Sequence, residues 1–331
     1  MTTPDSHQAI RPRRNRKSCA IRTLCRETRL SHESLIYPIF VHEAHHDEEI
    51  SSMPGCKRWS PDGILREVAE AHSLGIGAIV LFPVIDGDLK SANADECHND
   101  EGLIPRTIRA IKKETPDVAV ITDIALDPYN SDGHDGLVSE SGKILNDETI
   151  KVLCKQAVCH ARAGADIVAP SDMMDGRVGA IRTALDNTGH DETSILSYTA
   201  KYASAYYGPF RNALGSAPKV GDKKTYQMDP ANAREALREA SLDIDEGADM
   251  IMIKPAGPYL DVLALVASNV DVPVAAYQVS GEYLMIESAA SAGWINREEV
   301  IKESLTGIHR AGANAVLTYF AKDVAGWLRK D

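Results

Sequence analysis

Eight short apolar runs recur along this chain, with polar, helix-like stretches between them. They are rich in Ile, Val, Leu and Ala, and they are continuous rather than alternating, which is typical of parallel strands buried on both faces. The runs are 35–41, 78–83, 118–124, 166–169, 194–198, 250–253, 272–279 and 315–320. The pattern predicts a repeated strand–helix unit, which limits the chain to a small set of α/β folds.

Glycine precedes several of these runs at the same relative position. Gly75, Gly164, Gly247 and Gly312 each lie just before a predicted strand, where a glycine can end a helix by adopting the left-handed conformation. The repeated order of helix, glycine and strand predicts an α/β fold of the (β/α)8 TIM barrel type. A doubly wound open sheet is the alternative, but no G-x-G-x-x-G motif follows an early strand.

The segment before the first run is extra to this repeat. We expect residues 1–34 to form an extended N-terminal arm and residues 35–331 to form the catalytic barrel. The arm carries the basic run RPRRNRK at 11–17, whereas the whole chain has a net charge of −12. Such a run can bind nucleic acid or act as a localisation patch. In an acidic chain we expect instead a solvated arm, or an arm that docks on the acidic surface of a sister subunit, and no nucleic-acid partner. An arm of this length has little to pack on within one barrel, which suggests an oligomer.

Composition limits the compartment and the core. The six cysteines show no C-x-x-C spacing, so neither a disulfide framework nor a zinc knuckle is expected. No apolar run reaches membrane-spanning length, and the N-terminus lacks the apolar stretch of a signal peptide. We therefore expect a soluble cytoplasmic protein with no membrane partner. Aromatic residues make up only 5% of the chain, which predicts an aliphatic core.

Two lysines occupy matching positions at the ends of apolar runs. Residues 194–200 lead to Lys201, and residues 247–253 lead to Lys254. A buried ammonium is unfavourable, so such a lysine is usually either paired or neutral. Two lysines in one pocket would lower each other's pKa, and a neutral lysine forms Schiff bases with ketones. The pair predicts carbonyl chemistry, with salt-bridged or snorkelling lysines as the alternative.

Polar residues follow the other predicted strands as well. In a (β/α)8 barrel the active site is built from the carboxyl ends of the strands. We therefore expect one shared site that contains Asp123, Asp127, Ser171, Asp172, Lys201, Lys254, Ser280 and Tyr319.

The long loop after the fifth strand is a predicted lid, because long barrel loops commonly close over a site. Its Arg211, Lys223 and Gln227 are candidates for binding a substrate carboxylate. A solvated charged loop is the alternative.

The loop after the third strand is rich in oxygen ligands. It contains four aspartates and one histidine between Asp123 and Asp135. Carboxylate oxygens suit Mg²⁺ or a monovalent cation better than zinc, although Asx turns explain some of these residues equally well.

Ten short motifs lie along the chain. They are RPRR at 11–14, YPIFV at 37–41, SMPG at 52–55, APSDMMDGR at 169–177, SYTAKYAS at 197–204, YGPFR at 207–211, YQMDPAN at 226–232, MIKP at 252–255, PYLD at 258–261 and QVSGEY at 278–283. Together they resemble the porphobilinogen synthase (5-aminolevulinate dehydratase) family over residues 10–328. The resemblance implies a TIM barrel with an N-terminal arm, assembled into a homo-octamer. It also implies a hydro-lyase that condenses two 5-aminolevulinate molecules asymmetrically to porphobilinogen, with loss of two waters, in tetrapyrrole (heme) biosynthesis.

The resemblance further implies roles for individual residues. Lys254 would form a Schiff base with the substrate that supplies the propionate side (the P site). Lys201 would do so with the substrate that supplies the acetate side (the A site). Asp123 and Ser171 match catalytic groups around the substrate amine and keto group. The matches to substrate-binding residues are Arg211, Lys223 and Gln227 at the A site, Ser280 and Tyr319 at the P site, and Asp127 and Asp135 in the third loop.

Metal use is where this family divides. Its zinc-dependent members carry three cysteines where this chain has Ala125, Asp127 and Asp135. The chain therefore resembles the zinc-independent, magnesium-activated type, and no zinc is expected. Glu239 matches the ligand of an allosteric Mg²⁺, and a monovalent cation is a further candidate.

Two other functions stay open on the sequence. A class I aldolase on the same barrel would need only one essential lysine. A non-enzymatic assembly or sensor protein would keep the barrel and the arm, although the intact pair of strand-end lysines argues against it.

Overall fold

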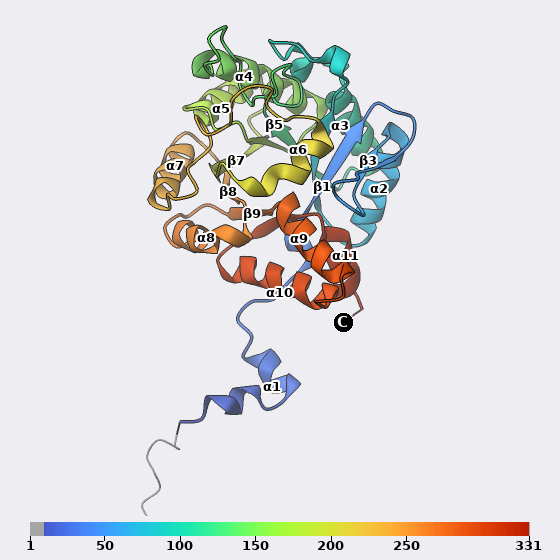
Figure 1. Ribbon diagram of the computed structural model, residues 1–331, viewed down its shortest axis with the longest axis vertical. Helices are drawn as coiled ribbons and strands as arrows, with labels where there is room; N and C mark the ends of the chain where they lie inside the picture. Colours follow the sequence, from blue (N-terminus) through green and yellow to red (C-terminus); the bar gives the residue numbers. More distant parts are fainter. Residues whose placement is uncertain (1–9, 331) are drawn as a thin grey trace, which may run out of the picture.

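The computed structural model describes residues 10–330 as a barrel with a separate N-terminal arm (Figure 1). Each barrel strand pairs in parallel with the next, and β10 pairs back with β1, so the sheet closes on itself. The barrel strands are β1 (Leu35–His42), β4 (Ala78–Val84), β5 (Ala119–Ile124), β6 (Ile167–Pro170), β7 (Ser194–Lys201), β8 (Met250–Lys254), β9 (Val274–Gln278) and β10 (Ala315–Thr318). The predicted (β/α)8 barrel is confirmed.

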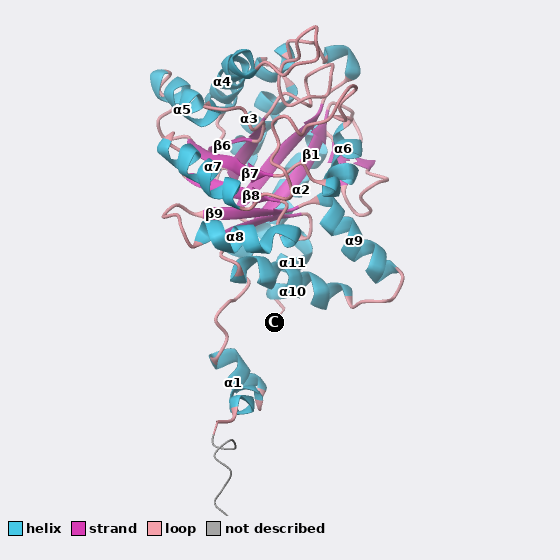
Figure 2. Cartoon of the chain, turned by 60° about the vertical axis from the view of Figure 1, so that its left-hand side comes forward, coloured by secondary structure: helices cyan, strands magenta, loops and turns pink. Residues whose placement is uncertain are grey.

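Helices alternate with these strands and cover the outside of the barrel (Figure 2). They are α2 (Pro61–Ser73), α3 (Leu103–Glu114), α4 (Asn146–Ala163), α5 (Arg177–Asn187), α7 (Arg234–Asp245), α8 (Leu260–Ala267), α10 (Arg297–Arg310) and α11 (Ala321–Leu328). Two more helices, α6 (Gly208–Leu214) and α9 (Ser280–Ser291), follow β7 and β9 and pack against each other at the carboxyl end of the barrel. A short hairpin of β2 (Glu48–Glu49) and β3 (Lys57–Trp59) extends the sheet beside β1.

The predicted glycine helix ends are present. Gly164 ends α4 with a φ of 106°, and Gly247 follows α7 with a φ of 102°. A side chain would be strained in this left-handed conformation, so glycine is the residue that lets the chain leave the helix and enter the strand. Gly75 and Gly312 also have positive φ values, of 90° and 116°.

The buried core is mainly aliphatic, as predicted, with a minority of aromatic side chains. Its largest fully buried side chains include Tyr198, Tyr202, Tyr277, Phe40 and Phe82. The chain has few aromatic residues, but the fold gathers them near the carboxyl ends of the strands. Overall composition could not show that concentration, because it averages over the whole sequence.

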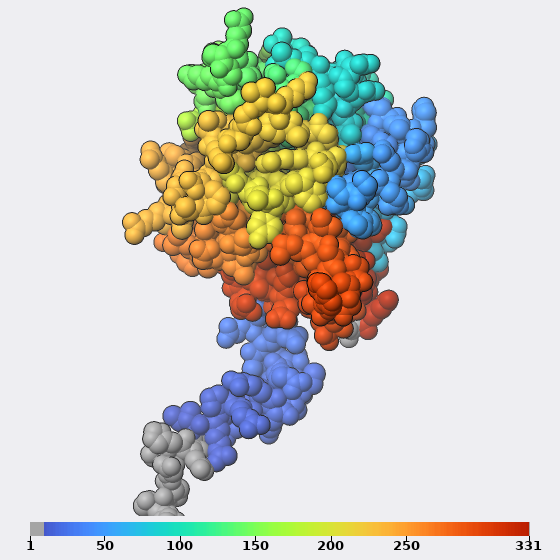
Figure 3. Space-filling view, viewed as in Figure 1, coloured from blue at the N-terminus to red at the C-terminus, as the bar shows by residue number. Residues whose placement is uncertain are grey.

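The arm projects away from the barrel in the ribbon and space-filling views (Figures 1 and 3). It contains the short helices η2 (Pro12–Arg16), α1 (Cys19–Leu24) and η3 (His32–Ser34), none of which has a buried residue. It joins β1 at the amino end of that strand, on the side opposite the strand ends that form the site. Residues 1–9 of the expected arm and residue 331 of the expected barrel lie outside the described part of the chain.

Candidate active site

A small cavity lies at the carboxyl ends of the strands, where the sequence places the site. Its volume is 30 Å³, room for a few water molecules at most, so the structure shows the site in a closed form. Nine of the predicted residues line it: Asp123, Asp127, Asp135, Ser171, Lys201, Arg211, Lys223, Gln227 and Lys254.

Lys201 and Lys254 are the last residues of β7 and β8, and they are directly paired in register on these neighbouring strands. Both side chains are buried, and both line the cavity. The two amines therefore share one pocket and lie on the same face of the sheet.

Aromatic rings surround Lys254. Its Nζ lies 4.5 Å from the ring centre of Tyr277, 5.0 Å from Tyr198, 5.2 Å from Phe210 and 5.3 Å from Tyr207. Ring faces attract an ammonium, but the rings also exclude water, and this loss of hydration is the larger effect. Burial, reinforced by the positive charge of Lys201, lowers the pKa of Lys254 to about 7. A substantial fraction of this amine is therefore neutral near neutral pH.

Lys201 has charged and polar partners instead. Its Nζ lies 3.0 Å from Asp135 Oδ1 and donates a hydrogen bond to the carbonyl oxygen of Ser171. Asp135 also contacts Lys223 at 2.8 Å, and Lys223 lies 3.3 Å from Asp127. Although burial opposes ionisation, the ammonium groups of Lys201 and Lys223 hold the pKa of Asp135 below its ordinary value. These contacts form a buried network of two lysines and two aspartates.

The positive charges of both lysines act on the carboxyl group of Asp123. It is the fifth residue of β5, and one of its carboxylate oxygens, Oδ1, has no hydrogen-bond partner among the described residues. Burial raises the pKa of Asp123 to about 6, while the nearby charge of Lys201 opposes this rise. A carboxyl group with this pKa can both hold and release a proton near neutral pH.

The segment after β7 covers the site, and it is drawn in yellow across the centre of Figure 3. It contains η6 (Ala205–Tyr207) and α6, and it brings Arg211, Lys223 and Gln227 to the cavity. Gln227 is buried, and its Oε1 accepts no hydrogen bond from the described residues. Arg211 and Lys223 therefore place positive charge at the cavity beneath this segment, and Gln227 Oε1 is able to accept a hydrogen bond there.

Ser280 and Tyr319 lie beside the cavity rather than on its wall. Ser280 is the first residue of α9, and its Oγ accepts a hydrogen bond from the backbone N–H of Phe210, in the lid, at 3.0 Å. The hydroxyl of Tyr319 lies 2.7 Å from that of Tyr277, whose ring contacts Lys254. Both residues are thus on the Lys254 side of the site, behind its aromatic shell.

Glu239 lies in a different cavity, of 310 Å³, between α7 and the backbone of the lid. Its lining also contains the cation Lys224 and other side chains that carry oxygen: Asn146, Asp175, Thr225, Tyr226, Gln227, Asp229, Asn232 and Glu235. Burial raises the pKa of Glu239. The positive charge of Arg177 opposes this rise, and the carboxylates of Asp243, Asp175 and Glu235 add to it. A bound cation would relieve this concentration of negative charge.

Sequence reasoning did not assign the aromatic shell to the site. Phe82, Phe210 and Tyr277 contact the cavity or Lys254, yet none was among the predicted site residues. The chain has only four phenylalanines, and Phe40, Phe82 and Phe210 pack against one another here. Phe40 and Phe82 lie near the carboxyl ends of their strands, and in a chain this poor in aromatics that position was the available signal.

Comparison with known proteins identifies the family. Residues 9–327 match the sequence profile described as Delta-aminolevulinic acid dehydratase. The chain is 57% identical to proteins named "Delta-aminolevulinic acid dehydratase, chloroplastic" from Physcomitrium patens and Oryza sativa subsp. japonica. Each match covers 96% of this chain and 74% or 75% of the relative. A crystal structure of the Toxoplasma gondii enzyme in complex with porphobilinogen matches with a TM-score of 0.95 and 56% identity, over 96% of this chain and 91% of that chain.

The names of the relatives contradict the expected location. The plant and moss relatives are named chloroplastic, so the expectation of a cytoplasmic protein is wrong. The expectation rested on unpaired cysteines and on the lack of a membrane-spanning run, and neither property distinguishes one aqueous compartment from another. No helix among residues 10–330 is long and apolar enough to cross a membrane.

The matches extend over almost the whole chain, and the barrel agrees with that of the Toxoplasma gondii enzyme. Condensation of two 5-aminolevulinate molecules to porphobilinogen, a hydro-lyase reaction of tetrapyrrole biosynthesis, is therefore its activity, as the sequence motifs predicted. The chain belongs to the delta-aminolevulinic acid dehydratase family.

Proposed function

We propose that this reaction proceeds through Schiff bases on both Lys254 and Lys201. The observation that carries the proposal is the pairing of these lysines at the ends of neighbouring strands, in one closed cavity. A reaction that joins two keto substrates through Schiff bases on both of them uses two amines side by side, and the paired lysines supply them.

Lys254 would bind the first substrate, at the P site, because it is the amine that most readily loses its proton. The neutral Nζ attacks the keto carbon, the carbonyl oxygen takes up protons, and water leaves as the imine forms. Asp123 is suited to transfer a proton during these steps, since its pKa is about 6. Ser280 and Tyr319 would hold the substrate carboxylate on this side of the site.

Lys201 would bind the second substrate, at the A site. The cations Arg211 and Lys223, together with Gln227, would hold its carboxylate beneath the lid. Asp127 and Asp135 would balance the charge of the lysines and orient them toward the substrate. In this proposal the two aspartates are partners of ammonium groups rather than ligands of a metal.

Trapping of the intermediates tests the proposal. Incubation with labelled 5-aminolevulinate and borohydride, followed by peptide mapping, should place label on Lys254 and, at higher substrate concentration, on Lys201. Lys322 is a control within the same protein, because it is bound by Glu67 and Glu70 outside the site and should stay unlabelled. Label on one lysine only, with full activity of a Lys201→Met variant, would contradict the proposal and favour aldolase-like chemistry.

We also propose that Mg²⁺ is the activating metal of this metal-dependent family, and that it binds at Glu239. Among residues 10–330, no group of three or more His, Cys, Asp or Glu side chains is placed to hold a bare ion. Mg²⁺ retains several waters and is commonly held by one or two carboxylates, which suits the oxygen-rich cavity around Glu239. There it would neutralise charge beside the lid. Zinc prefers thiolates, and the third loop has Ala125, Asp127 and Asp135 in place of cysteines.

The arm is proposed to assemble the chain into a homo-octamer. It exposes apolar Ile10 and Leu24 together with the basic residues Arg13, Arg14 and Arg16, and such a surface suits an acidic sister subunit. Because the relatives are named chloroplastic, we propose a plastid location, which fractionation of the source cells would test.

A further inference from the structure

Strand β7 is irregular just before Lys201. Ser197 pairs with Ile251 of β8, and the next pair is Ala200 with Ile253, followed by Lys201 with Lys254. Three residue steps on β7 therefore match two steps on β8, which is a β-bulge with one extra residue. The extra residue lies between Ser197 and Ala200.

The bulge decides which way Lys201 points. Tyr198 faces the inside of the barrel, where its ring contacts Lys254, while Ser197 and Thr199 face outward toward α7. In a regular strand side chains alternate, so Lys201 would lie on the same outer face as Ser197 and Thr199. The extra residue shifts this alternation by one position, so Lys201 turns inward beside Lys254.

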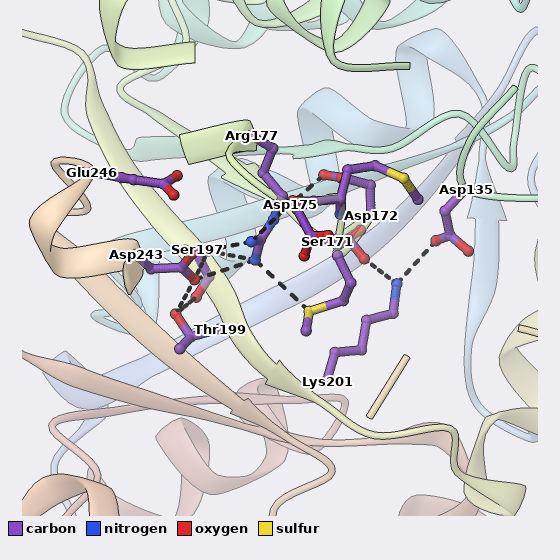
Figure 4. Close-up of polar contacts among 12 residues, drawn as sticks. Asp135, Ser171, Asp172, Asp175, Arg177, Ser197, Thr199, Lys201, Asp243 and Glu246 are labelled. Atoms are coloured by element: carbon purple, nitrogen blue, oxygen red, sulfur yellow. Dashed lines mark hydrogen bonds and ion pairs between the residues drawn. The ribbon is translucent and has the colours of Figure 1, made fainter. Parts of the chain in front are cut away.

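The carboxylate of Asp243, on α7, binds two residues of this irregular stretch of β7. Asp243 Oδ2 accepts a hydrogen bond from Ser197 Oγ at 2.7 Å and another from Thr199 Oγ1 at 2.7 Å (Figure 4). Arg177 of α5 holds this carboxylate with two contacts, Nη1 to Oδ1 at 3.0 Å and Nη2 to Oδ2 at 3.2 Å. All four side chains are buried, so these bonds are shielded from competing water.

Arg177 also contacts the turn that carries the second partner of Lys201, Ser171. Its Nη1 donates to the carbonyl oxygen of Met174, and its Nε lies 3.9 Å from Asp172 Oδ2. These residues form the turn after β6, in which Met173 adopts a φ of 67° and Asp172 accepts a hydrogen bond from the backbone N–H of Met174. The same turn begins at Ser171, whose carbonyl oxygen accepts the hydrogen bond of Lys201.

We infer that Asp243, held by Arg177, is a positioning residue for Lys201: it fixes the β-bulge that turns the lysine into the site. The inference rests on the proposed Schiff base at Lys201 and adds to it a cause for the orientation of that side chain. Asp243 lies on the outer face of the barrel and touches no reacting group. Its effect on the reaction would therefore be specific to one of the two lysines.

The test is the ratio of label on Lys201 to label on Lys254 after borohydride trapping. Thr199→Val removes one hydroxyl while keeping a β-branched side chain, and Asp243→Asn keeps the shape but loses the charge. Each should lower the ratio and kcat by about tenfold or more, since displacement of a reacting group by about 1 Å can cost a hundredfold in rate. Label on Lys254 should persist, which a general loss of structure would not allow.

Thr107→Val is the matched control. Thr107 is also a buried threonine, but within residues 10–330 its hydroxyl bonds only the carbonyl oxygen of Leu103 in its own helix, α3. The ratio of label on Lys201 to label on Lys254 in Thr107→Val should equal that of the parent. If Asp243→Asn does not fold, Thr199→Val decides the question alone, with circular dichroism as the check on folding.

Two results would overturn the inference, and they are distinguishable. If the parent protein carries label on both lysines and folded Thr199→Val keeps the parent ratio, the positioning role is wrong while the double Schiff base stands. If the parent carries no label on Lys201, the proposed Schiff base on Lys201 is wrong, and the inference, which depends on it, is wrong as well.

Discussion

At the scale of single residues, the two lysines have different surroundings. Lys254 lies among aromatic rings, and Lys201 lies against a carboxylate and a carbonyl oxygen. The sequence predicted two lysines in one pocket, because both follow apolar runs. It did not predict this difference, since the rings come from several strands and the lid, and Asp135 comes from a loop 66 positions away.

The rate should depend on the ionisation of Lys254. Its pKa is about 7, and the neutral amine is the attacking form. We expect kcat/KM to rise with pH up to about 7 and to level off above it. Phe210→Leu opens the aromatic shell to water, so the ammonium regains hydration and the pKa of Lys254 should rise. The rise of kcat/KM should then occur at higher pH. A pH profile unchanged between the two proteins would contradict the assignment.

Lys254 should also lower the stability of the fold. The folded state disfavours the ammonium, so between pH 7 and the ordinary lysine pKa of 10.5 the unfolded chain binds more protons. Lys254→Met should therefore raise the free energy of unfolding by about 1 kcal/mol, which is typical when a residue that destabilises the fold for the sake of activity is replaced. Urea unfolding should show the largest gain below pH 7 and a shrinking gain above it. A destabilised variant at pH 6 would refute this expectation.

Asp135 should matter more to stability than Asp127. Asp135 contacts both Lys201 and Lys223, whereas Asp127 contacts Lys223 only. Asp135→Asn leaves the ammonium of Lys201 without its carboxylate partner, so we expect a loss of about 3 kcal/mol at pH 7, as for a broken buried pair. Because its pKa is lowered in the fold, this contribution should disappear as the pH falls below the ordinary value of 3.8. Urea titrations of Asp135→Asn and Asp127→Asn at pH 7 would measure the difference.

At the scale of elements, the strands and their order were predictable, and the irregularities were not. The apolar runs located all eight barrel strands within a few residues, because parallel strands leave a continuous apolar pattern. The bulge in β7 leaves no such pattern: residues 197–200 read Ser-Tyr-Thr-Ala, and any regular strand could carry them. Its cause lies in Asp243, on a helix that follows the strand by more than 30 positions.

Closure of the lid should depend on the close approach of α9 to η6. A Cβ added at Gly281 would lie 2.5 Å from the backbone oxygen of Tyr206, and backbone cannot move aside as a flexible side chain can. Gly281→Ala should separate the two elements, raise KM about tenfold and lower kcat, since closure completes the site. Gly208→Ala is the control, because a Cβ there meets nothing within 4 Å in the same lid. Equal steady-state constants for Gly281→Ala and the parent would show that this contact does not govern closure.

At the scale of the whole molecule, the arm and the site lie at opposite ends of the barrel. The sequence pattern predicted a separate arm, because the segment before β1 lacks the strand–helix repeat. Composition could not give the compartment. The chloroplastic names of the relatives supplied that correction.

Removal of the arm should change assembly before it changes the barrel. The arm helices bury no residue, so a chain beginning at Ser34 should keep the barrel fold. We expect light scattering to show particles smaller than an octamer, with far-UV circular dichroism close to that of the parent. Octamers formed by the truncated chain would contradict the proposed role of the arm.

Magnesium should act through Glu239 without touching the lysines. Added Mg²⁺ should raise the thermal midpoint of the parent, because a ligand that binds the folded state stabilises it. Glu239→Gln should lose this shift and the activation by Mg²⁺, yet retain borohydride trapping at Lys254. Glu33→Gln, which alters an acid in the arm, is a control that should keep the shift. An Mg²⁺-dependent shift that persists in Glu239→Gln would place the ion elsewhere.

The exposed arm also offers a built-in handle for spectroscopy. Cys19 and Cys25 of the arm are solvent-exposed, whereas Cys97 and Cys159 are buried, and burial raises the pKa of the Cys159 thiol to about 12. A maleimide dye at limiting concentration should therefore couple to the arm first, because thiolate and access set the rate. Fluorescence from that dye would follow subunits as they join and separate, in real time and without an engineered cysteine.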